Sequence, residues 1–354
     1  MRVKLSDITQ YSKGVQINGD ELVDNGDYIY LNGGINPSGR WTESNVGANT
    51  VTISEGGNSS GYINYITEPF WCGAHCYYLF NGPKNTKYLY YALKSQQDRL
   101  LAIRSGACMP NIKKSDLGKF EFEFDINEQK QNEIVATLSR VENVIACRKR
   151  ELELLDDLIK ARFVEMFGDS ASNEKGWKMN TFGDICTVRQ GLQIPISKRL
   201  TEYEEDSYEY ITVQYLHGGK EKEYIKSPKE SVKCTKDDIL MTRTGNTGMV
   251  VTNVEGVFHN NFFLIDFDRE RFEKDFLVEY LNLDLIQADI TRRAGTSTIP
   301  DLNHGEFYKI KVFEPPIDLQ KEFDEFKMQV DKSKLMFQKL HQKLNILQKK
   351  VGDI

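Results

Sequence analysis

The chain has 354 residues, of which 40% are apolar and 28% are charged, and its formal net charge is −6. This length supports two or three domains with full-sized cores. The acidic balance excludes a uniformly basic protein that coats nucleic acid, but it leaves room for a local basic surface, because electrostatic steering depends on where the charges lie.

The sequence contains no run of the ~18 apolar residues that a membrane span needs, and Met1–Asp7 lacks the apolar centre of a signal peptide. We therefore expect a cytoplasmic protein that does not contact a membrane. Its six cysteines have no paired spacing, which favours reduced structural thiols. They are Cys72, Cys76, Cys108, Cys147, Cys186 and Cys234.

The first third of the chain predicts a mixed, mainly β domain. Short β-branched or alternating runs separated by Gly, Asn and Pro predict strands at residues 27–31, 50–54, 62–67 and 120–124. Helical spacing of apolar residues predicts a helix over residues 86–104. Asn127 then stands where an N-cap would begin a long helix, and Gly168 stands where a C′ glycine would end it.

The long helix over residues 127–168 carries apolar residues at alternating gaps of four and three, which is the coiled-coil pattern. A narrow apolar stripe of this kind needs a partner helix, and the C-terminus repeats the rhythm. The predicted seam residues are Leu138, Val141, Ile145, Leu152, Leu155 and Ile159 in the central helix, and Phe326, Val330, Phe337, Leu340, Leu344 and Leu347 in the C-terminal helix. We expect the two helices to pair in antiparallel orientation.

The second half of the chain repeats the first. The matched segments are Gly14–Ile17 with Gly191–Ile194, Tyr28–Leu31 with Tyr210–Val213, Gly57–Gly61 with Gly245–Gly248, a helix at 88–104 with one at 276–293, and the helix caps Asn127 with Asp318. The sequence therefore predicts an α+β fold with two pseudo-repeated mixed α/β domains separated by two long antiparallel coiled-coil helices. The predicted boundaries are 1–126 for the first domain, 127–168 for the central helix, 169–317 for the second domain and 318–354 for the C-terminal helix.

The search for catalytic and metal motifs is negative. Gly56–Gly61 lacks the Lys-Ser/Thr of a phosphate-binding loop, so we expect it to connect two strands. Cys72, His75 and Cys76 lack a second ligand pair at zinc-like spacing, so we expect core packing. Phe313–Pro316 resembles the Asp/Asn-Pro-Pro-aromatic loop of amino-methyltransferases, but Glu314 and Ile317 depart from that pattern, so we interpret it as the end of a strand before a helix. We expect no catalytic residue, metal or cofactor in this chain.

Polar residues in the predicted loops are candidates for contact with double-stranded DNA, because Asn, Gln and Arg read base edges while Lys and Arg hold phosphates. The candidates are Lys13, Asn32, Asn36, Arg40, Trp41, Asn58, Ser59 and Arg104 in the first half, and Arg189, Gln193, Gln214, Tyr215, His217, Arg243, Asn246, Asn260, Arg292 and Arg293 in the second. Any one of them taken alone is more often solvated surface. Two such clusters joined by a rigid helix, however, are what a reader of two separated half-sites requires. The charged faces of the helices fit a solvated exterior as well as a protein-docking surface.

Three segments resemble the specificity subunit of type I restriction–modification systems. They are Asp156–Asp169 at the end of the central helix, the turn Thr242–Gly248 and the junction Glu314–Lys321. The resemblance covers the order domain, helix, domain, helix, although the chain is short for the family and the first junction lacks the second's Pro-Pro.

The resemblance implies two target-recognition domains that each read half of a split DNA site, with helices that fix the spacer and dock methyltransferase subunits. It also implies that methylation and cleavage belong to separate modification and restriction subunits, which need S-adenosylmethionine, ATP and magnesium. One alternative is a stand-alone DNA methyltransferase or nuclease, and another is a purely structural coiled-coil scaffold. The bases that are read do not follow from the sequence, because direct readout depends on loop geometry.

Overall fold

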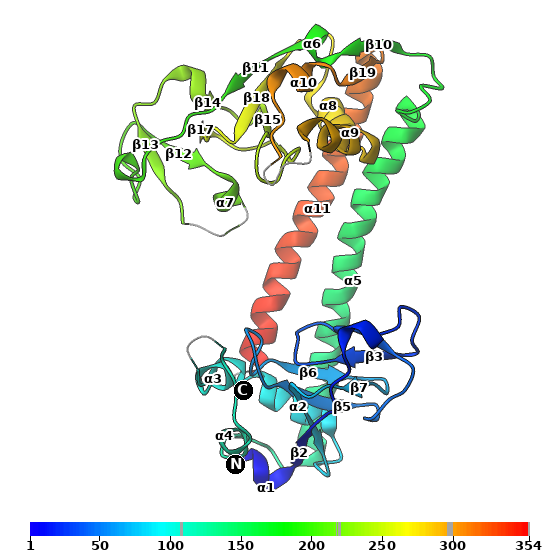
Figure 1. Ribbon diagram of the computed structural model, residues 1–354, viewed down its shortest axis with the longest axis vertical. Coiled ribbons are helices and arrows are strands. Elements are labelled where there is room, and N and C mark those ends of the chain that lie inside the picture. Colours follow the sequence, from blue (N-terminus) through cyan, green and yellow to red (C-terminus); the bar gives the residue numbers. More distant parts are fainter. Residues whose placement is uncertain (107–108, 217, 219–220, 296–299, 353–354) are drawn as a thin grey trace. The chain divides into compact units, whose positions relative to one another are not determined.

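The computed structural model describes residues 1–106, 109–216, 218, 221–295 and 300–352, with side chains up to residue 339. It divides into two compact units (Figure 1). Unit 1 comprises Met1–Arg150 with Phe337–Ile354, and unit 2 comprises Glu151–Met336. The two long helices, α5 (Glu128–Phe167) and α11 (Ile317–Gly352), each contribute to both units. None of the described helices is long and apolar enough to span a bilayer.

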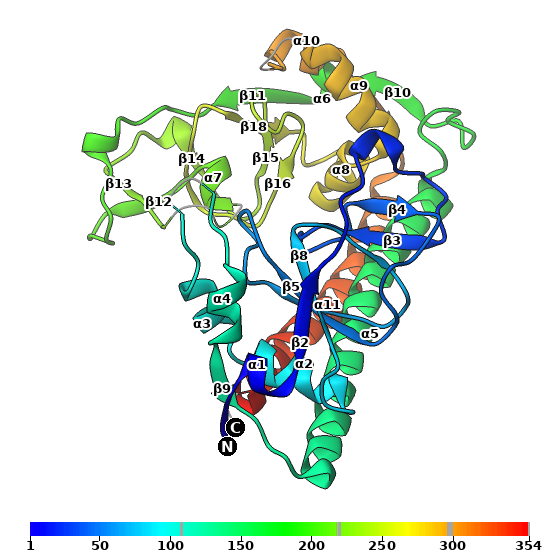
Figure 2. The same cartoon turned by 60° about the horizontal axis from the view of Figure 1, so that its bottom comes forward.

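The globular part of unit 1 consists of short strands and short helices. In chain order these are β1 (Arg2–Lys4), α1 (Leu5–Ile8), β2 (Gln10–Lys13), η1 (Gly19–Glu21), β3 (Tyr28–Leu31), β4 (Gly39–Trp41), β5 (Thr50–Ser54), β6 (Ile63–Ile66), β7 (Trp71–Cys72), β8 (Cys76–Phe80), α2 (Thr86–Lys94), α3 (Gln97–Ala102), α4 (Lys114–Gly118) and β9 (Glu121–Glu123). They form sheets of order β2-β8-β5-β6, β4-β3-β7 and β1-β9. Figure 2 shows β3 and β4 side by side, away from β9.

The globular part of unit 2 follows the same plan. Its elements are β10 (Lys178–Thr181), α6 (Phe182–Ile185), β11 (Cys186–Gln190), η2 (Ile196–Lys198), β12 (Ser207–Ile211), α7 (Val213–Leu216), β13 (Tyr224–Lys226), η3 (Glu230–Val232), β14 (Lys233–Cys234), β15 (Ile239–Thr242), β16 (Val250–Val251), β17 (Gly256–Phe258), β18 (Phe262–Phe267), α8 (Lys274–Leu281), α9 (Asp284–Ala294), α10 (His304–Tyr308) and β19 (Lys311–Glu314). The sheet orders β11-β18-β15-β16, β13-β12-β17-β14 and β10-β19 repeat those of unit 1 with β14 added. The predicted internal repeat is therefore confirmed at the level of topology.

The structure corrects the predicted register of one repeated segment. Tyr30 pairs in parallel with β7, and its hydroxyl donates to the Ile17 carbonyl at 3.3 Å. Tyr210 occupies the same place in unit 2, because it pairs in parallel with β17 and its hydroxyl donates to the Leu192 carbonyl at 2.8 Å. The counterpart of Tyr210 is thus Tyr30 and not Tyr28. The sequence match favoured the wrong tyrosine because both stand in one β-strand pattern.

The single helix predicted in each domain is also wrong, because each is broken into two. The break lies between α2 and α3 in unit 1, and between α8 and α9 in unit 2. The second helix of each pair is turned so that a glutamine reaches the neighbouring loop: Gln97 Nε2 donates to the Gly61 carbonyl at 2.6 Å, and Gln287 Nε2 to the Gly248 carbonyl at 3.0 Å. The apolar spacing gave no sign of this change of direction.

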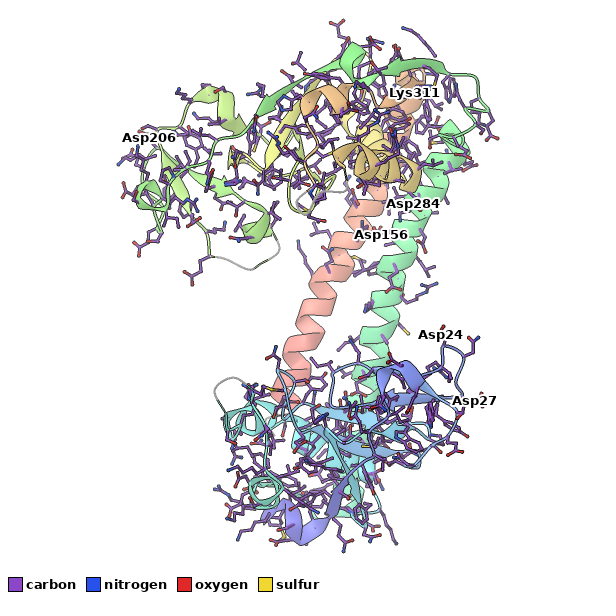
Figure 3. The ribbon with its side chains drawn as sticks, viewed as in Figure 1. Asp24, Asp27, Asp156, Asp206, Asp284 and Lys311 are labelled. Carbon is purple, nitrogen blue, oxygen red and sulfur yellow. The ribbon has the colours of Figure 1, made fainter. Side chains whose placement is uncertain are left out.

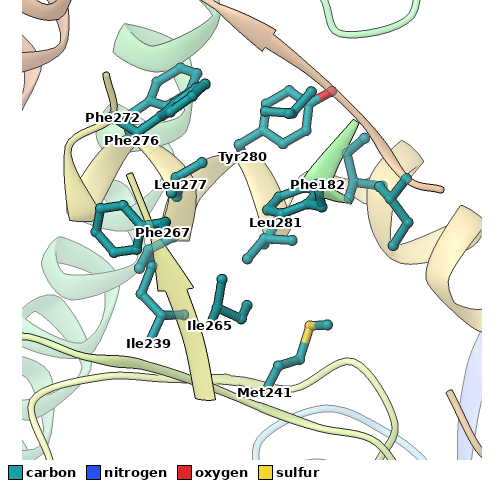
Figure 4. Packing of buried hydrophobic residues seen from close by; sticks show 14 of the residues in the cluster. Phe182, Ile239, Met241, Ile265, Phe267, Phe272, Phe276, Leu277, Tyr280 and Leu281 are labelled. Carbon is teal, nitrogen blue, oxygen red and sulfur yellow. The ribbon is translucent and has the colours of Figure 1, made fainter. Parts of the chain in front are cut away.

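The larger core lies in unit 2, where α8 packs on the strands and on the long helices. Figure 4 shows Phe276, Tyr280 and Leu281 of α8 together with Ile265 of β18. The ring of Phe163 in α5 lies 5.5 Å from that of Phe276 and 5.4 Å from that of Phe323 in α11. Both long helices therefore belong to this core as well as to the coiled-coil pair. Burial of such aromatic side chains is a main source of stability.

The burial of α5 follows the pattern of the predicted seam. Leu138 and Ile159 are buried, the seam residues between them are half-buried, and the flanking Val144 and Leu154 are exposed. In α11, Val330 is buried, and the structure does not describe the side chains of Leu340, Leu344 and Leu347, which lie beyond residue 339.

Ion pairs between the two long helices follow an antiparallel register. Arg162 Nη2 donates to Glu322 at 3.0 Å, and Lys334 Nζ donates at 2.6 Å to Asp156, which projects from α5 where α11 runs beside it (Figure 3). As the residue number rises along α5, the number of its partner in α11 therefore falls. This confirms the predicted antiparallel pairing.

The ends of the long helices match the predicted caps in part. Asn127 Oδ1 accepts the Lys130 N–H at 3.1 Å and so caps α5. Gly168 closes α5 with φ +84°, and its N–H donates to the Val164 carbonyl at 2.8 Å. The prediction that Asp318 caps α11 is wrong: α11 begins at Ile317, and the Leu319 N–H already bonds the Pro316 carbonyl at 3.0 Å. The preceding Pro315-Pro316 starts the helix earlier than the polar signal suggested.

Candidate nucleic-acid interface

Several predicted site residues of unit 1 gather where four loops meet. In the loop that follows β2, the Val15 N–H donates to the Cys72 carbonyl at 2.9 Å. A Cβ on Gly14 would lie 1.8 Å from that carbonyl oxygen, so this loop can approach Cys72 only because residue 14 is glycine. Asn32 Oδ1 accepts the His75 N–H at 3.2 Å, and its Nδ2 donates to Gln16 at 3.1 Å. Asn32 thus ties three loops together.

The loop between β5 and β6 completes this cluster. Ser59 Oγ donates to the Gly33 carbonyl at 2.6 Å, and Arg104 Nη1 donates to the Asn58 carbonyl at 3.4 Å. The exposed Asn58 side chain lies at the tip of this loop. This loop is the strand-connecting turn that the sequence predicts, with Gly57 and Gly61 at positive φ.

A carboxylate that the sequence analysis missed sits at the centre of the unit 1 cluster. Glu55 pairs with Lys13, and its Oε2 lies 3.6 Å from Nδ1 of His75. The Glu55 N–H donates to the His75 carbonyl at 2.8 Å. A single acid in a glycine-rich loop carries no sequence signal of its own, and only its place beside Lys13 identifies it.

The candidates on the β3–β4 hairpin lie apart from this cluster or join it indirectly. Arg40 donates to the carbonyls of Gly26 and, at 3.0 Å, of Asp27, so it holds its own hairpin. Asn36 is exposed. The Trp41 ring meets the Trp71 ring edge-on at 6.3 Å, and Trp71 Nε1 donates to the Val15 carbonyl at 2.8 Å. Trp41 is therefore linked to the cluster through Trp71.

Unit 2 repeats the loop cluster with different side chains. The Leu192 N–H donates to the Phe258 carbonyl at 3.1 Å, and a Cβ on Gly191 would lie 2.3 Å from that oxygen. Arg243 follows β15, where its Nε and Nη2 donate to the two carboxylate oxygens of Asp301 at 2.9 and 2.7 Å. The exposed Asn246 lies at the tip of the same loop, in the place that Asn58 has in unit 1.

The remaining candidates of unit 2 are spread over other surfaces. Arg189 Nη1 donates to the Ser231 carbonyl at 3.1 Å, and the Tyr215 hydroxyl donates to Glu209 at 3.3 Å. Arg292 and Arg293 both pair with Asp289 on α9. None of these four side chains bonds the Arg243 loop among the described residues, although Gln287 of α9 donates to the Gly248 carbonyl in that loop. Of the other predicted residues, Gln193 and Gln214 are exposed, and His217 lies outside the described residues.

Three buried side-chain atoms of unit 2 have no hydrogen-bond partner in the part of the chain that the structure describes. They are Oδ1 of Asn260, which was a sequence candidate, and Nε2 of His304 and Oδ1 of Asp324, which were not. Burial lowers the pKa of His304, and the nearby Arg243 guanidinium lowers it further. His304 is therefore neutral at neutral pH. In the sequence, the one signal for His304 is that it follows shortly after the repeated Gly295–Pro300 segment.

The described residues offer no metal centre, since no group of three or more His, Cys, Asp or Glu side chains is arranged to bind an ion. Cys72 and Cys76 lie in a small apolar core with Leu31, Val46 and Phe70. The Cys76 side chain and burial raise the pKa of the Cys72 thiol, so it stays protonated. What the loop clusters offer chemically is directional hydrogen bonding by amides and guanidinium groups on a fixed backbone.

Comparison with known proteins identifies the family of the chain that carries these two loop clusters. The sequence matches the type I restriction modification DNA specificity domain over residues 1–156 and 174–346. The chain belongs to the type I restriction–modification DNA specificity family. Each of the two matched segments contains one of the loop clusters and part of one of the long helices.

Relatives and solved structures within the family agree with the fold. A putative type I specificity subunit of Mycoplasma genitalium is 31% identical over 206 residues, which is 54% of this chain and 52% of that protein. A type I restriction enzyme specificity subunit of Methanocaldococcus jannaschii is 27% identical over 151 residues, covering 38% of this chain and 34% of that protein. These alignments thus span about half or less of the length of the relatives.

Among solved structures, the type I restriction–modification S subunit of M. genitalium superimposes with a TM-score of 0.66 at 23% identity, covering 99% of this chain and 94% of that one. A chain from a study of type I restriction–modification complex assembly gives a TM-score of 0.58 at 14% identity, covering 100% of this chain and 96% of that one. At these identities the likeness establishes the fold: two repeated α+β domains with two long helices.

Proposed function

We propose that this chain is the DNA-recognition subunit of a type I restriction–modification complex and has no catalytic activity of its own. The two target-recognition domains, residues 1–126 and 169–317, each read one half of a bipartite site. The observation that supports this most strongly is the duplicated loop cluster, in which two copies of one sheet topology present different polar side chains at matched positions.

The charge of the chain fits recognition by directed hydrogen bonds better than binding by bulk electrostatics. With a net charge of −6 and with Lys13 and Arg243 each held by a carboxylate, the clusters carry little free positive charge for phosphates. Base edges, in contrast, are neutral donors and acceptors that fixed amide and guanidinium groups match. The phosphate contacts would come in larger part from partner subunits.

The long helices give the proposed subunit its second role. The 40-residue α5 leads from the first domain to the second, and a helix of this length extends about 60 Å. We infer that the helices set the spacer between half-sites and dock the modification subunits, which use S-adenosylmethionine. Restriction subunits that use ATP and magnesium would join the same assembly in the cytoplasm.

Selection from a library of randomised DNA duplexes by the chain assembled with its modification subunits tests this function. The expected result is two blocks of preferred bases separated by a spacer of constant length and free sequence. A single continuous block, or no preferred sequence, would contradict the proposal. Methyl transfer by the purified chain alone would support a stand-alone methyltransferase instead.

A further inference from the structure

Arg243 is held on both its backbone and its side chain. Its N–H donates to the Asn261 carbonyl at 2.7 Å, and its carbonyl accepts the Leu302 N–H at 2.9 Å. Its guanidinium binds both oxygens of Asp301, and the side chain is 20% exposed. An arginine fixed in this way loses little conformational entropy when a ligand arrives, so it favours discrimination over loose attraction.

The outer edge of the Arg243 guanidinium remains available. Asp301 takes Nε and one N–H of Nη2, and none of the other described residues bonds Nη1 or the second N–H of Nη2. These two groups point away in parallel, which is the geometry that binds O6 and N7 of guanine. Phosphate oxygens match the same fork. The Asp301 carboxylate, however, neutralises the arginine and repels a phosphate, whereas guanine offers two uncharged acceptors.

The equivalent position in unit 1 carries the opposite charge. The Glu55 N–H donates to the His75 carbonyl at 2.8 Å, and its carbonyl accepts the Ile112 N–H at 2.9 Å, so its backbone bonds repeat those of Arg243. The bridge between Gly56 and Asn111 likewise repeats the bridge between Thr244 and Asp301. Unit 1 therefore has Glu55 and Asn111 where unit 2 has Arg243 and Asp301.

We propose that Arg243 reads a guanine in the half-site of the second domain, that Asp301 is the residue that positions it, and that the first domain lacks this guanine contact because Glu55 and Asn111 replace the pair. The inference rests on the proposed DNA-recognition function and specifies it further. It assigns a base and a position to a loop that the sequence marks only as polar.

The loss-of-function test uses the chain assembled with its modification subunits and the randomised-duplex selection. Arg243→Lys keeps the charge but lacks the planar fork, so we expect preference for one G·C pair in one half-site to fall by about 5- to 150-fold. Asp301→Asn keeps Arg243 but weakens its support, so the same base pair should lose part of its preference. Arg269→Lys, a change to an arginine that pairs with Asp238 and stacks on Phe267, is the matched control and should leave every preference unchanged.

A gain-of-function variant keeps the inference testable even if the first variants fold poorly. Glu55→Arg combined with Asn111→Asp installs the unit 2 pair on the unit 1 backbone, and it should create a new guanine preference in the other half-site. Single Glu55→Arg should do so more weakly, because the new arginine has no carboxylate partner.

Distinct results would overturn the inference. If Arg243→Lys weakened all duplexes equally, or relaxed bases in both half-sites, Arg243 would be a phosphate or structural residue while bipartite recognition stood. If the double variant folded and assembled but kept the original preferences, the charge at position 55 would not set the base. If the unmodified complex selected no sequence, the proposed function itself would fail.

Discussion

In each unit an ion pair joins the globular domain to a long helix, and we call this contact the joint of that unit. The two joints carry their charges the opposite way round. In unit 1 the cation belongs to the domain: Lys87 of α2 binds Glu142 of α5 at 3.1 Å, and the Tyr91 hydroxyl donates to the same carboxylate at 2.7 Å. In unit 2 the cation belongs to the long helix: Lys327 of α11 binds Glu279 of α8 at 2.8 Å and Asp275 at 3.3 Å.

The surroundings of the two joints differ as much as their polarity. Lys87 is 25% exposed and lies over the rings of Tyr65, Tyr90 and Tyr91, at 4.7, 5.1 and 5.0 Å from their centroids. Lys327 is 10% exposed, and although burial lowers its pKa, the carboxylates beside it outweigh burial and leave the pKa raised. Each domain is therefore joined to a long helix by an ion pair, but the charges on the domain and on the helix are reversed between the two units.

Removing the buried cation should have the largest effect. Lys327→Met keeps the length of the side chain but leaves Glu279 and Asp275 without their partner in a desolvated site, so we expect the free energy of unfolding to fall by about 3–5 kcal/mol. Urea denaturation measures this loss. The exposed Lys332 on the same helix supplies the control Lys332→Met, which should cost less than about 0.5 kcal/mol. Equal costs for the two variants would show that the joint does not depend on Lys327.

The unit 2 joint should also make stability depend on pH through Asp324. Burial raises the pKa of this carboxyl to about 7, aided by Asp275 and Glu273 and opposed by Lys327 and Lys274, and its Oδ1 has no hydrogen-bond partner among the described residues. Because the folded pKa lies above the unfolded one, the contribution to stability is complete below about pH 4 and is lost as pH rises to about 7.

Asp324→Asn isolates this contribution. Between pH 4 and pH 7 the unmodified protein should lose about 2 kcal/mol more than the variant does, a figure that allows for the half-buried position. Urea unfolding of both proteins at several pH values measures the difference. Parallel stability curves would mean that Asp324 titrates in the folded protein as it does in the unfolded chain.

Charge reversal in unit 1 should have a smaller effect because that joint is more open to solvent. Lys87→Glu sets two carboxylates against each other and should lower the free energy of unfolding by about 1–2 kcal/mol. Adding Glu142→Lys restores an ion pair with the polarity of unit 2 and should recover at least half of the loss. If the double variant recovered none of the lost free energy of unfolding, contacts with the tyrosine rings, and not the ion pair, would stabilise this joint.

Patterns that repeat along the chain predicted the long helices, their seam and the duplicated domains, because a period of 3.5 residues and a repeated turn are properties of sequence alone. The seam at Leu138 and Ile159 and the cap at Asn127 are examples. The break between α8 and α9 did not follow, because the apolar spacing continues through it, and the contact of Gln287 with the Gly248 carbonyl involves a distant part of the chain.

The candidate site was harder to predict than the fold. Polar loop residues were found, but the partners that decide their roles come from distant parts of the chain. Asp301 is 58 residues from Arg243, and Glu55 is 42 residues from Lys13. Composition and spacing carry no record of such pairings, so the sequence could not separate Arg243, which keeps an outer edge available, from Arg40, which holds its own hairpin.

Independent reading by the two domains is the central claim, and a matched pair of loop-tip variants tests it most directly. Asn58 and Asn246 lie at equivalent exposed positions, and neither side chain bonds the backbone of another loop in the described structure. Asn58→Ala and Asn246→Ala should therefore leave stability unchanged. In the randomised-duplex selection, each should relax one base position by about 1–3 kcal/mol, in different half-sites. Relaxation by both variants in the same half-site, or by either in both half-sites, would contradict the claim.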